Sequence, residues 1–204
     1  MLRESDGNLV LESKKMNVHY QLRPIKKLHD IQEGTQIAVK CAFKNLHPDL
    51  KRFYPMFEKE PEYYHHGVYI GEHENHGRFT VAHFSGTSKD DAKPQGCDFL
   101  EFTANAADNQ IYEVVHDNPQ PIQVEETLRR AQSVLDNPGI WPGYQIMLNN
   151  CEHFANWLKI GESVSMQIEF AAHKFISVAA EVMLTSSGVS AGSLQNIISE
   201  KKSS

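Results

Sequence analysis

The sequence has few cysteines, no surplus of basic residues and no long uninterrupted apolar run. Its three cysteines, Cys41, Cys97 and Cys151, are widely spaced, which excludes a disulfide framework and favours a reducing compartment. Acidic residues outnumber basic ones, 26 to 20, and the net charge of -6 argues against sequence-independent binding to nucleic acid. The first 15 residues contain no apolar stretch of signal-peptide length, so a cytoplasmic location is expected.

What the sequence does contain is typical of one folded domain. Hydrophobic residues make up 40% of its 204 residues and charged residues 23%, and the apolar residues are spread along the whole length. A chain of this length fits a single core better than two separate ones. The first 33 residues are polar with short apolar interruptions, and we expect them to be a loosely attached extension.

Local patterns predict several strands. Residues 44–64 separate the first strand from the others; they carry three prolines and many charges, which is typical of a long surface connection. The segment HENHG is all that separates the second and third strands, which predicts a hairpin. Strands are predicted at 34–43, 65–72, 78–86, 98–103 and 111–117.

Helical periodicity is found in three segments. Apolar residues recur at helical spacing from Val124 to Leu135, and Asn137-Pro138-Gly139 ends that run. A second helix is predicted after Asn149 or Asn150. The third, an apolar stripe over 164–183, is interrupted by charges and is not a membrane span. It either packs on the domain or lies in a lipid interface.

Cys151 lies at the start of the second helix. Asn149 or Asn150 is a plausible N-cap and Gly161 sits where a C-cap glycine belongs, so the cysteine falls in the first turn. The exposed amide groups and the helix dipole there favour a thiolate, which predicts a lowered pKa for Cys151. A nucleophilic cysteine also needs a nearby histidine, oriented by a third polar group.

Histidines on strands are better placed for this role than histidines on loops. His65 or His66 precedes GVYIG, and His83 lies within TVAHF, so a hairpin would bring His83 beside the first histidine on one face. A zinc site is the competing interpretation, but His73 and His76 are three apart in a predicted turn, not four apart on a helix. We therefore predict no metal, and expect His66, His73 and His76 at the surface.

Three segments, HHGVYIGE, VAHF and NNCEHFANWLKIG, together resemble the lecithin:retinol acyltransferase-like (LRAT) domain, which includes the H-rev-type phospholipases and acyltransferases. The most specific part is Asn-Cys-Glu-His-Phe at 150–154, which is identical to the family signature. The second is the His-x-Gly-Val-Tyr element at 65–69. The segment IQEGTQIAVK is similar to the strand that opens such domains.

The resemblance implies Cys151 as nucleophile, His65 as general base and His83 as the polar group that orients it. The implied fold is α+β, a permuted relative of the NlpC-type and papain-like cysteine enzymes, in which histidine strands precede the cysteine helix. The implied chemistry is attack on a phospholipid acyl ester, giving a thioester that water or an acyl acceptor resolves. A phospholipid substrate, transient contact with a membrane surface and no cofactor follow from it.

Two other functions remain open alongside this one. The same cysteine and histidines would serve an amidase or peptidase of the NlpC type, and a non-catalytic interaction module could retain the fold. For the chain as a whole, we expect an extension at 1–33, an LRAT-like catalytic domain at 34–161, and an amphipathic helix with a polar tail at 162–204. Cys41 and Cys97 are expected to be structural, His153 to support the helix, and Phe154 and Trp157 to belong to the core.

Overall fold

The computed structural model of the protein describes residues 2–5, 8–13, 18–41, 63–73, 77–86, 90–104, 106–143, 145 and 148–172. Residues 44–62 of the connection predicted at 44–64, His76, the side chain of His73 and the predicted C-terminal helix beyond residue 172 lie outside this set. The last two residues of that predicted connection, 63 and 64, begin a strand. The chain divides into two compact units, residues 1–169 and 170–204. Within the described part, no helix is both long enough and apolar enough to cross a membrane.

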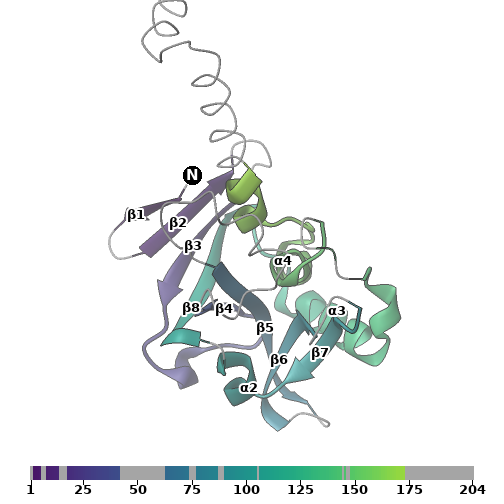
Figure 1. The fold of residues 1–204 in the computed structure, drawn as a ribbon. Coiled ribbons are helices and arrows are strands. Elements are labelled where there is room, and N and C mark those ends of the chain that lie inside the picture. Colours follow the sequence, from purple (N-terminus) through teal and green to yellow (C-terminus); the bar gives the residue numbers. More distant parts are fainter. Residues whose placement is uncertain are drawn as a thin grey trace, which may run out of the picture. The chain divides into compact units, whose positions relative to one another are not determined.

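The described strands form one eight-stranded sheet in which every neighbouring pair is antiparallel (Figure 1). Their order across the sheet is β1-β2-β3-β8-β4-β5-β6-β7, so the sheet and the accompanying helices confirm a mixed α+β architecture. The strands are β1 Leu2–Ser5, β2 Asn8–Ser13, β3 Val18–Pro24, β4 Gln36–Cys41, β5 Tyr63–His73, β6 Gly77–Ser85, β7 Lys93–Cys97 and β8 Ala106–Asn118. The helices whose two ends are described are α2 Phe99–Thr103, α3 Val124–Asp136 and α4 Cys151–Ile160, with short 3-10 turns η1 Leu28–Asp30 and η4 Pro138–Ile140. Residues 166–172 are also helical.

Successive strand residues point to opposite faces of the sheet, so each face can pack against its own layer. Different helices cover the two faces. On one face, α3 and α4 pack on β5 and β6 through a buried apolar cluster that includes Val68, Phe84 and Phe154. On the other face, α2 packs through Phe102 against Val39 and Val81. The predicted core role of Phe154 is confirmed, and Trp157 packs at the margin of the same cluster.

The expectation of a loosely attached N-terminal extension is wrong. β3 lies inside the sheet, paired with β2 on one side and β8 on the other. Its alternate residues Val18, Tyr20 and Leu22 are buried in a cluster with Tyr64 of β5. The polar residues between them dominate the composition and hide the two-residue period that marks a half-buried strand.

The strand predicted at 98–103 is also wrong, because this segment is helix α2. The Asp98 carboxylate accepts a hydrogen bond from the backbone N–H of Glu101 at 2.8 Å and so caps the helix. The helix turns Phe102 inward and leaves Leu100 79% exposed. Just before it, KPQGC forms the edge strand β7, which its proline and glycine obscure in the sequence.

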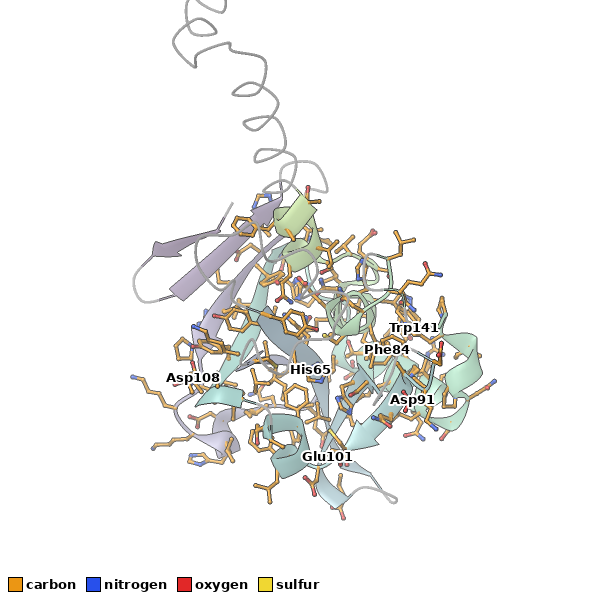
Figure 2. The ribbon with its side chains drawn as sticks, in the orientation of Figure 1. His65, Phe84, Asp91, Glu101, Asp108 and Trp141 are labelled. Carbon is orange, nitrogen blue, oxygen red and sulfur yellow. The ribbon has the colours of Figure 1, made fainter. Side chains whose placement is uncertain are left out.

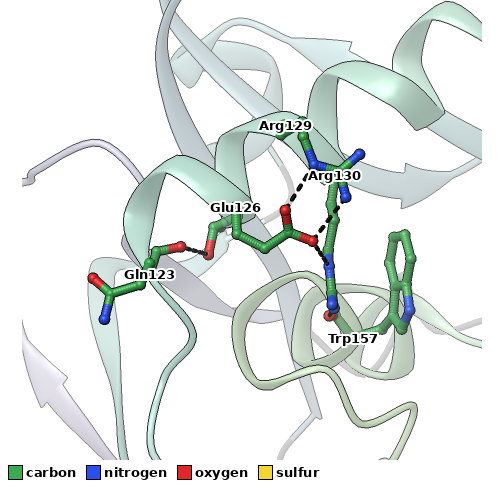
Figure 3. A network of polar contacts seen from close by, with 6 residues as sticks. Gln123, Glu126, Arg129, Arg130 and Trp157 are labelled. Atoms are coloured by element: carbon green, nitrogen blue, oxygen red, sulfur yellow. Dashed lines mark hydrogen bonds and ion pairs between the residues drawn. The ribbon is translucent and has the colours of Figure 1, made fainter.

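Helix α3 confirms the periodicity noted in the sequence, and a polar network joins it to α4 (Figure 3). Glu126 accepts hydrogen bonds from Arg129 and Arg130, each one turn further along α3. Arg130 also donates to the backbone oxygen of Trp157 at 3.0 Å, and its guanidinium lies 5.3 Å from the centre of that indole ring. This contact fixes the end of α4 that is remote from Cys151.

Candidate active site

Cys151 is the first residue of α4, and the start of this helix is defined by a capping box. The side-chain oxygen of Asn150 accepts hydrogen bonds from the N–H groups of Glu152 and His153, at 2.9 and 3.1 Å. His153 returns a bond, because its Nδ1 accepts from the Asn150 N–H at 3.3 Å. Gly161 ends the helix in the left-handed conformation. The predicted N-cap, C-cap and supporting role of His153 are confirmed.

The β5–β6 hairpin brings His65 and His83 together, as its pattern predicts. The strands pair with Gly67 opposite His83, and His65 Nε2 lies 2.9 Å from His83 Nδ1. Figure 2 labels His65 among the side chains of the sheet. Phe102 of α2 packs on both imidazoles, with ring centres 5.2 Å from His65 and 5.9 Å from His83. A Cβ at Gly67 would lie 2.8 Å from the Phe102 ring, so glycine at this position permits the close approach.

The sulfur of Cys151 lies against the first residues of β5. Its Sγ is 3.1 Å from the hydroxyl of Tyr63, two residues before His65. Tyr63 and His65 share one side of β5, because side chains alternate along a strand. Within the described part of the chain, no hydrogen bond joins the sulfur to an imidazole nitrogen.

The start of α4 can reach β5 because β5 and β6 separate before the first residues of β5. The Tyr69 N–H donates to the backbone oxygen of Thr35 on the β4 side, and backbone N–H groups alternate along a strand, so the His66 N–H points toward the β6 side. No described residue of β6 pairs with His66, because regular β5–β6 pairing ends at Gly67 and His83, while β6 continues along β7 to Ser85. The start of α4 therefore approaches β5 where β6 leaves it.

The sequence matches a known family. The family model described as lecithin retinol acyltransferase matches residues 51–164, more than half of the chain, and this segment contains Cys151, His65 and His83. The chain belongs to the lecithin retinol acyltransferase family. It is 43% identical over 47 residues to the human protein named phospholipase A and acyltransferase 1. That stretch covers 23% of this chain and 26% of the relative, and no solved structure shows a significant match.

The thiol in this member of the lecithin retinol acyltransferase family is protonated at neutral pH. Burial raises the pKa of Cys151 to about 11, although hydrogen bonds from Tyr63 and from the backbone of His66 and Glu152 act in the opposite direction. The expectation of a lowered pKa is wrong, because the cost of burying a thiolate exceeds the stabilisation from the helix start. Cys151 is only 2% exposed.

The imidazoles of His65 and His83 are neutral at the same pH. Burial lowers the pKa of His65 to about 4, with a smaller contribution from His66. Burial likewise lowers the pKa of His83 to about 3, and His65 adds to the effect. At neutral pH the site therefore holds a protonated thiol and two uncharged rings.

His66 was expected at the surface, and that expectation is wrong. The ring is fully buried on the α4 side of the sheet, where its Nδ1 accepts a hydrogen bond from Gln36 Nε2 at 3.2 Å. The same amide group donates to Asn156 of α4, and its oxygen accepts from His116 Nε2 at 2.7 Å. His66 belongs to a buried polar cluster that joins β4, β5, β8 and α4. Its side chain is buried because it points to the face of the sheet that α4 covers.

Glu152 is a second structural residue of the signature. Its buried carboxylate accepts hydrogen bonds from the Tyr20 hydroxyl at 2.6 Å and from the Met166 N–H at 2.8 Å. Ser165 and Gln167 donate to the same group. The carboxylate therefore ties the first turn of α4 to β3 and to the segment that follows α4.

Sequence reasoning missed Tyr63, which contacts the sulfur. The available signal was its position two residues before His65, because a two-residue spacing places both side chains on one side of a strand. Among the described residues, no group of three or more His, Cys, Asp or Glu side chains could hold a metal ion. The competing zinc interpretation concerns His73 and His76, which lie outside the described side chains.

Proposed function

We propose that the protein is a thiol-dependent phospholipid acyltransferase or phospholipase, with Cys151 as nucleophile, His65 as general base and His83 as the group that orients His65. One observation carries the proposal: the signature cysteine contacts Tyr63, two residues from a histidine that is hydrogen-bonded to a second histidine. Membership of the family and the name of the human relative support the ester substrate. The permuted papain-like arrangement of sheet and cysteine helix belongs to the same proposal.

In the first step, Cys151 Sγ attacks the carbonyl carbon of a phospholipid acyl ester. His65 Nε2 is occupied by His83, so Nδ1 is the nitrogen that accepts the thiol proton. The carbonyl π electrons move to oxygen as the S–C bond forms. When the tetrahedral intermediate collapses, the ester C–O bond breaks and the departing alkoxide takes the proton from His65. A thioester on Cys151 remains.

In the second step, water, an alcohol or an amine attacks the thioester carbon. His65 accepts the proton of this nucleophile and returns it to the departing sulfur, so the resting thiol is restored. Water as nucleophile completes a phospholipase reaction, whereas an alcohol or amine completes an acyl transfer. His83 holds the His65 ring in one orientation throughout, through the 2.9 Å hydrogen bond.

The decisive experiment compares the wild-type protein with Cys151→Ala on phosphatidylcholine vesicles. We expect acyl release from the wild type only, and an acyl adduct on Cys151 by mass spectrometry. Cys97→Ala is the matched control, since this buried thiol lies in the cluster beneath α2 and contacts the backbone oxygen of Val81. Equal acyl release by wild type and Cys151→Ala would overturn the proposal, as would cleavage of small peptide amides in preference to lipid esters.

Contact with a membrane surface is part of the proposed function, and one surface of the described chain supports it. A cavity of about 530 Å³ is lined by residues of η1 and its approach, by Phe99 of α2 and by Ile111 of β8. Leu28 at this cavity is 45% exposed and the neighbouring Leu100 of α2 is 79% exposed. α2 also carries Phe102, which packs on His65.

The charge at this cavity suits anionic lipid. Lys26 and Lys27 line it, and neither forms an ion pair with a described residue. A lysine near an anionic leaflet contributes about 1 kcal/mol of attraction. We expect Lys26→Glu/Lys27→Glu to weaken co-sedimentation with phosphatidylcholine vesicles that contain phosphatidylserine, whereas exposed Lys93→Glu should not. Equal losses of vesicle binding in the Lys26→Glu/Lys27→Glu variant and in Lys93→Glu would contradict a specific role for this surface.

A further inference from the structure

Tyr63 is placed to act on the reacting atoms. Its hydroxyl lies 3.1 Å from Cys151 Sγ, across 88 residues of sequence. Its backbone is fixed, because Tyr63 is paired with Cys41 in β4. The ring is partly exposed. The contact therefore joins a rigid strand position to the atom that would carry out the chemistry.

The direction of this hydrogen bond is determined once the reaction begins. A phenol can donate or accept, and so can a thiol, so either atom is a possible donor in the resting protein. When the thiol loses its proton, sulfur can only accept. The Tyr63 hydroxyl must then donate to the sulfur, and this hydrogen bond stabilises the thiolate. The same hydrogen bond acts to lower the pKa of Cys151.

The same donor is within reach of the oxygen that becomes charged next. In the tetrahedral intermediate, the oxyanion is two bonds from sulfur, because the attacked carbon joins them. An oxyanion donor must lie about 2.7–3.1 Å from the position of that oxygen. A hydroxyl already at hydrogen-bonding distance from sulfur reaches this position by a small rotation of the phenol.

We propose that Tyr63 is a further catalytic residue, whose hydroxyl donates a hydrogen bond first to the sulfur of Cys151 and then to the carbonyl oxygen of the tetrahedral intermediate. The inference rests on the proposed function. Tyr63 keeps its proton throughout. The thiol proton goes to His65, the carbonyl electron pair goes to the oxygen that Tyr63 binds, and collapse of the intermediate returns that pair as the C–O bond to the leaving group breaks.

The test uses Tyr63→Phe in the full chain, which removes one oxygen and keeps the ring. Removing one oxyanion donor costs about 10²–10³-fold in kcat in well-studied enzymes. We expect a fall of at least about tenfold in kcat for acyl release, with little change in KM. Tyr112→Phe is the matched control, because that ring is half-buried on β8 of the same sheet and lies edge-to-face against Tyr64. It should leave kcat unchanged.

Alkylation of Cys151 by iodoacetamide separates catalysis from structure, since this reaction forms no oxyanion. In Tyr63→Phe, the pH profile of alkylation should shift upward slightly, while acyl release falls by a much larger factor. Unchanged kcat would overturn the proposal. Equal losses in alkylation and acyl release would also overturn it. Such a result would mean that Tyr63 only stabilises the thiolate or the local structure and does not bind the oxyanion.

The outcome for Tyr63 is distinguishable from the outcome for the proposed function. A wild-type protein that releases no acyl chain from any phospholipid overturns the proposed function, whatever Tyr63 does. A wild type that does release acyl chains, together with a fully active Tyr63→Phe, overturns only the role of the tyrosine. Thermal melting of both tyrosine variants confirms that each is folded under the assay conditions.

Discussion

His65 and His83 touch each other but have different roles in the proposed chemistry. His65 would exchange a proton with the substrate, whereas His83 would act only through its 2.9 Å bond to His65. We expect His65→Ala to lower kcat by about 10²–10⁴-fold, which is the usual contribution of a general base. His83→Ala should cost less, because His65 remains. Steady-state kinetics on vesicles measure both, and a larger loss in His83→Ala would reverse the assignment.

At the scale of residues, the sequence predicts contacts that depend on local pattern and misses those that depend on burial. The meeting of His65 and His83 follows from two short strands and a turn, so it could be predicted. The inward position of His66 could not, because it depends on Gln36 and Asn156 from elements far away in the chain. The predicted lowering of the Cys151 pKa is wrong for the same reason. The helix start can be recognised in the sequence, whereas the burial of the thiol cannot.

At the scale of elements, the capping box of α4 is the local feature that holds Cys151. Asn150→Ala would leave the N–H groups of Glu152 and His153 without their acceptor, and we expect unfolding free energy to fall by about 1 kcal/mol. Denaturant unfolding measures the change. Asn137→Ala is the control, because the exposed Asn137 side chain makes no capping bond, and a surface substitution changes stability by less than about 0.5 kcal/mol. Equal effects would contradict the role of the cap.

Elements with strong local signals were predicted, and elements defined by their neighbours were not. α4 has a cap at each end, and β5 and β6 have a clear hairpin pattern. The strand prediction at 98–103 is wrong because a five-residue segment with aromatic residues fits either structure until Asp98 is recognised as its cap. The sequence does not predict β3, because β3 pairs with β8, which lies about 90 residues later in the chain. Only in that pairing are the alternate residues of β3 buried in the core.

At the scale of the whole molecule, the buried histidines predict how stability depends on pH. Burial lowers the pKa of His65 to about 4 and the pKa of His66, His83 and His116 to about 3, from 6.5. Between pH 6.5 and about 4, the unfolded chain binds protons that the folded protein does not. Unfolding free energy should therefore fall as pH decreases through this range, by up to about 1.4 kcal/mol per pH unit for each histidine.

Thermal or urea unfolding between pH 7 and pH 4 measures this dependence. His116→Gln removes one titrating ring and keeps a donor that can bond the Gln36 oxygen, so its stability should vary less steeply with pH. A wild-type stability that is constant or rises on acidification would contradict burial of these rings in neutral form.

The burial of Cys151 has a consequence for how damage to the protein would be detected. The pKa of this thiol is about 11 in the folded protein, against 9.0 for an unperturbed cysteine. Loosening the fold at neutral pH would therefore increase the reactivity of the sulfur toward general alkylating reagents, while separating it from His65 and Tyr63. A preparation that has begun to denature would label faster and turn over more slowly, so thiol titration alone would overstate its quality.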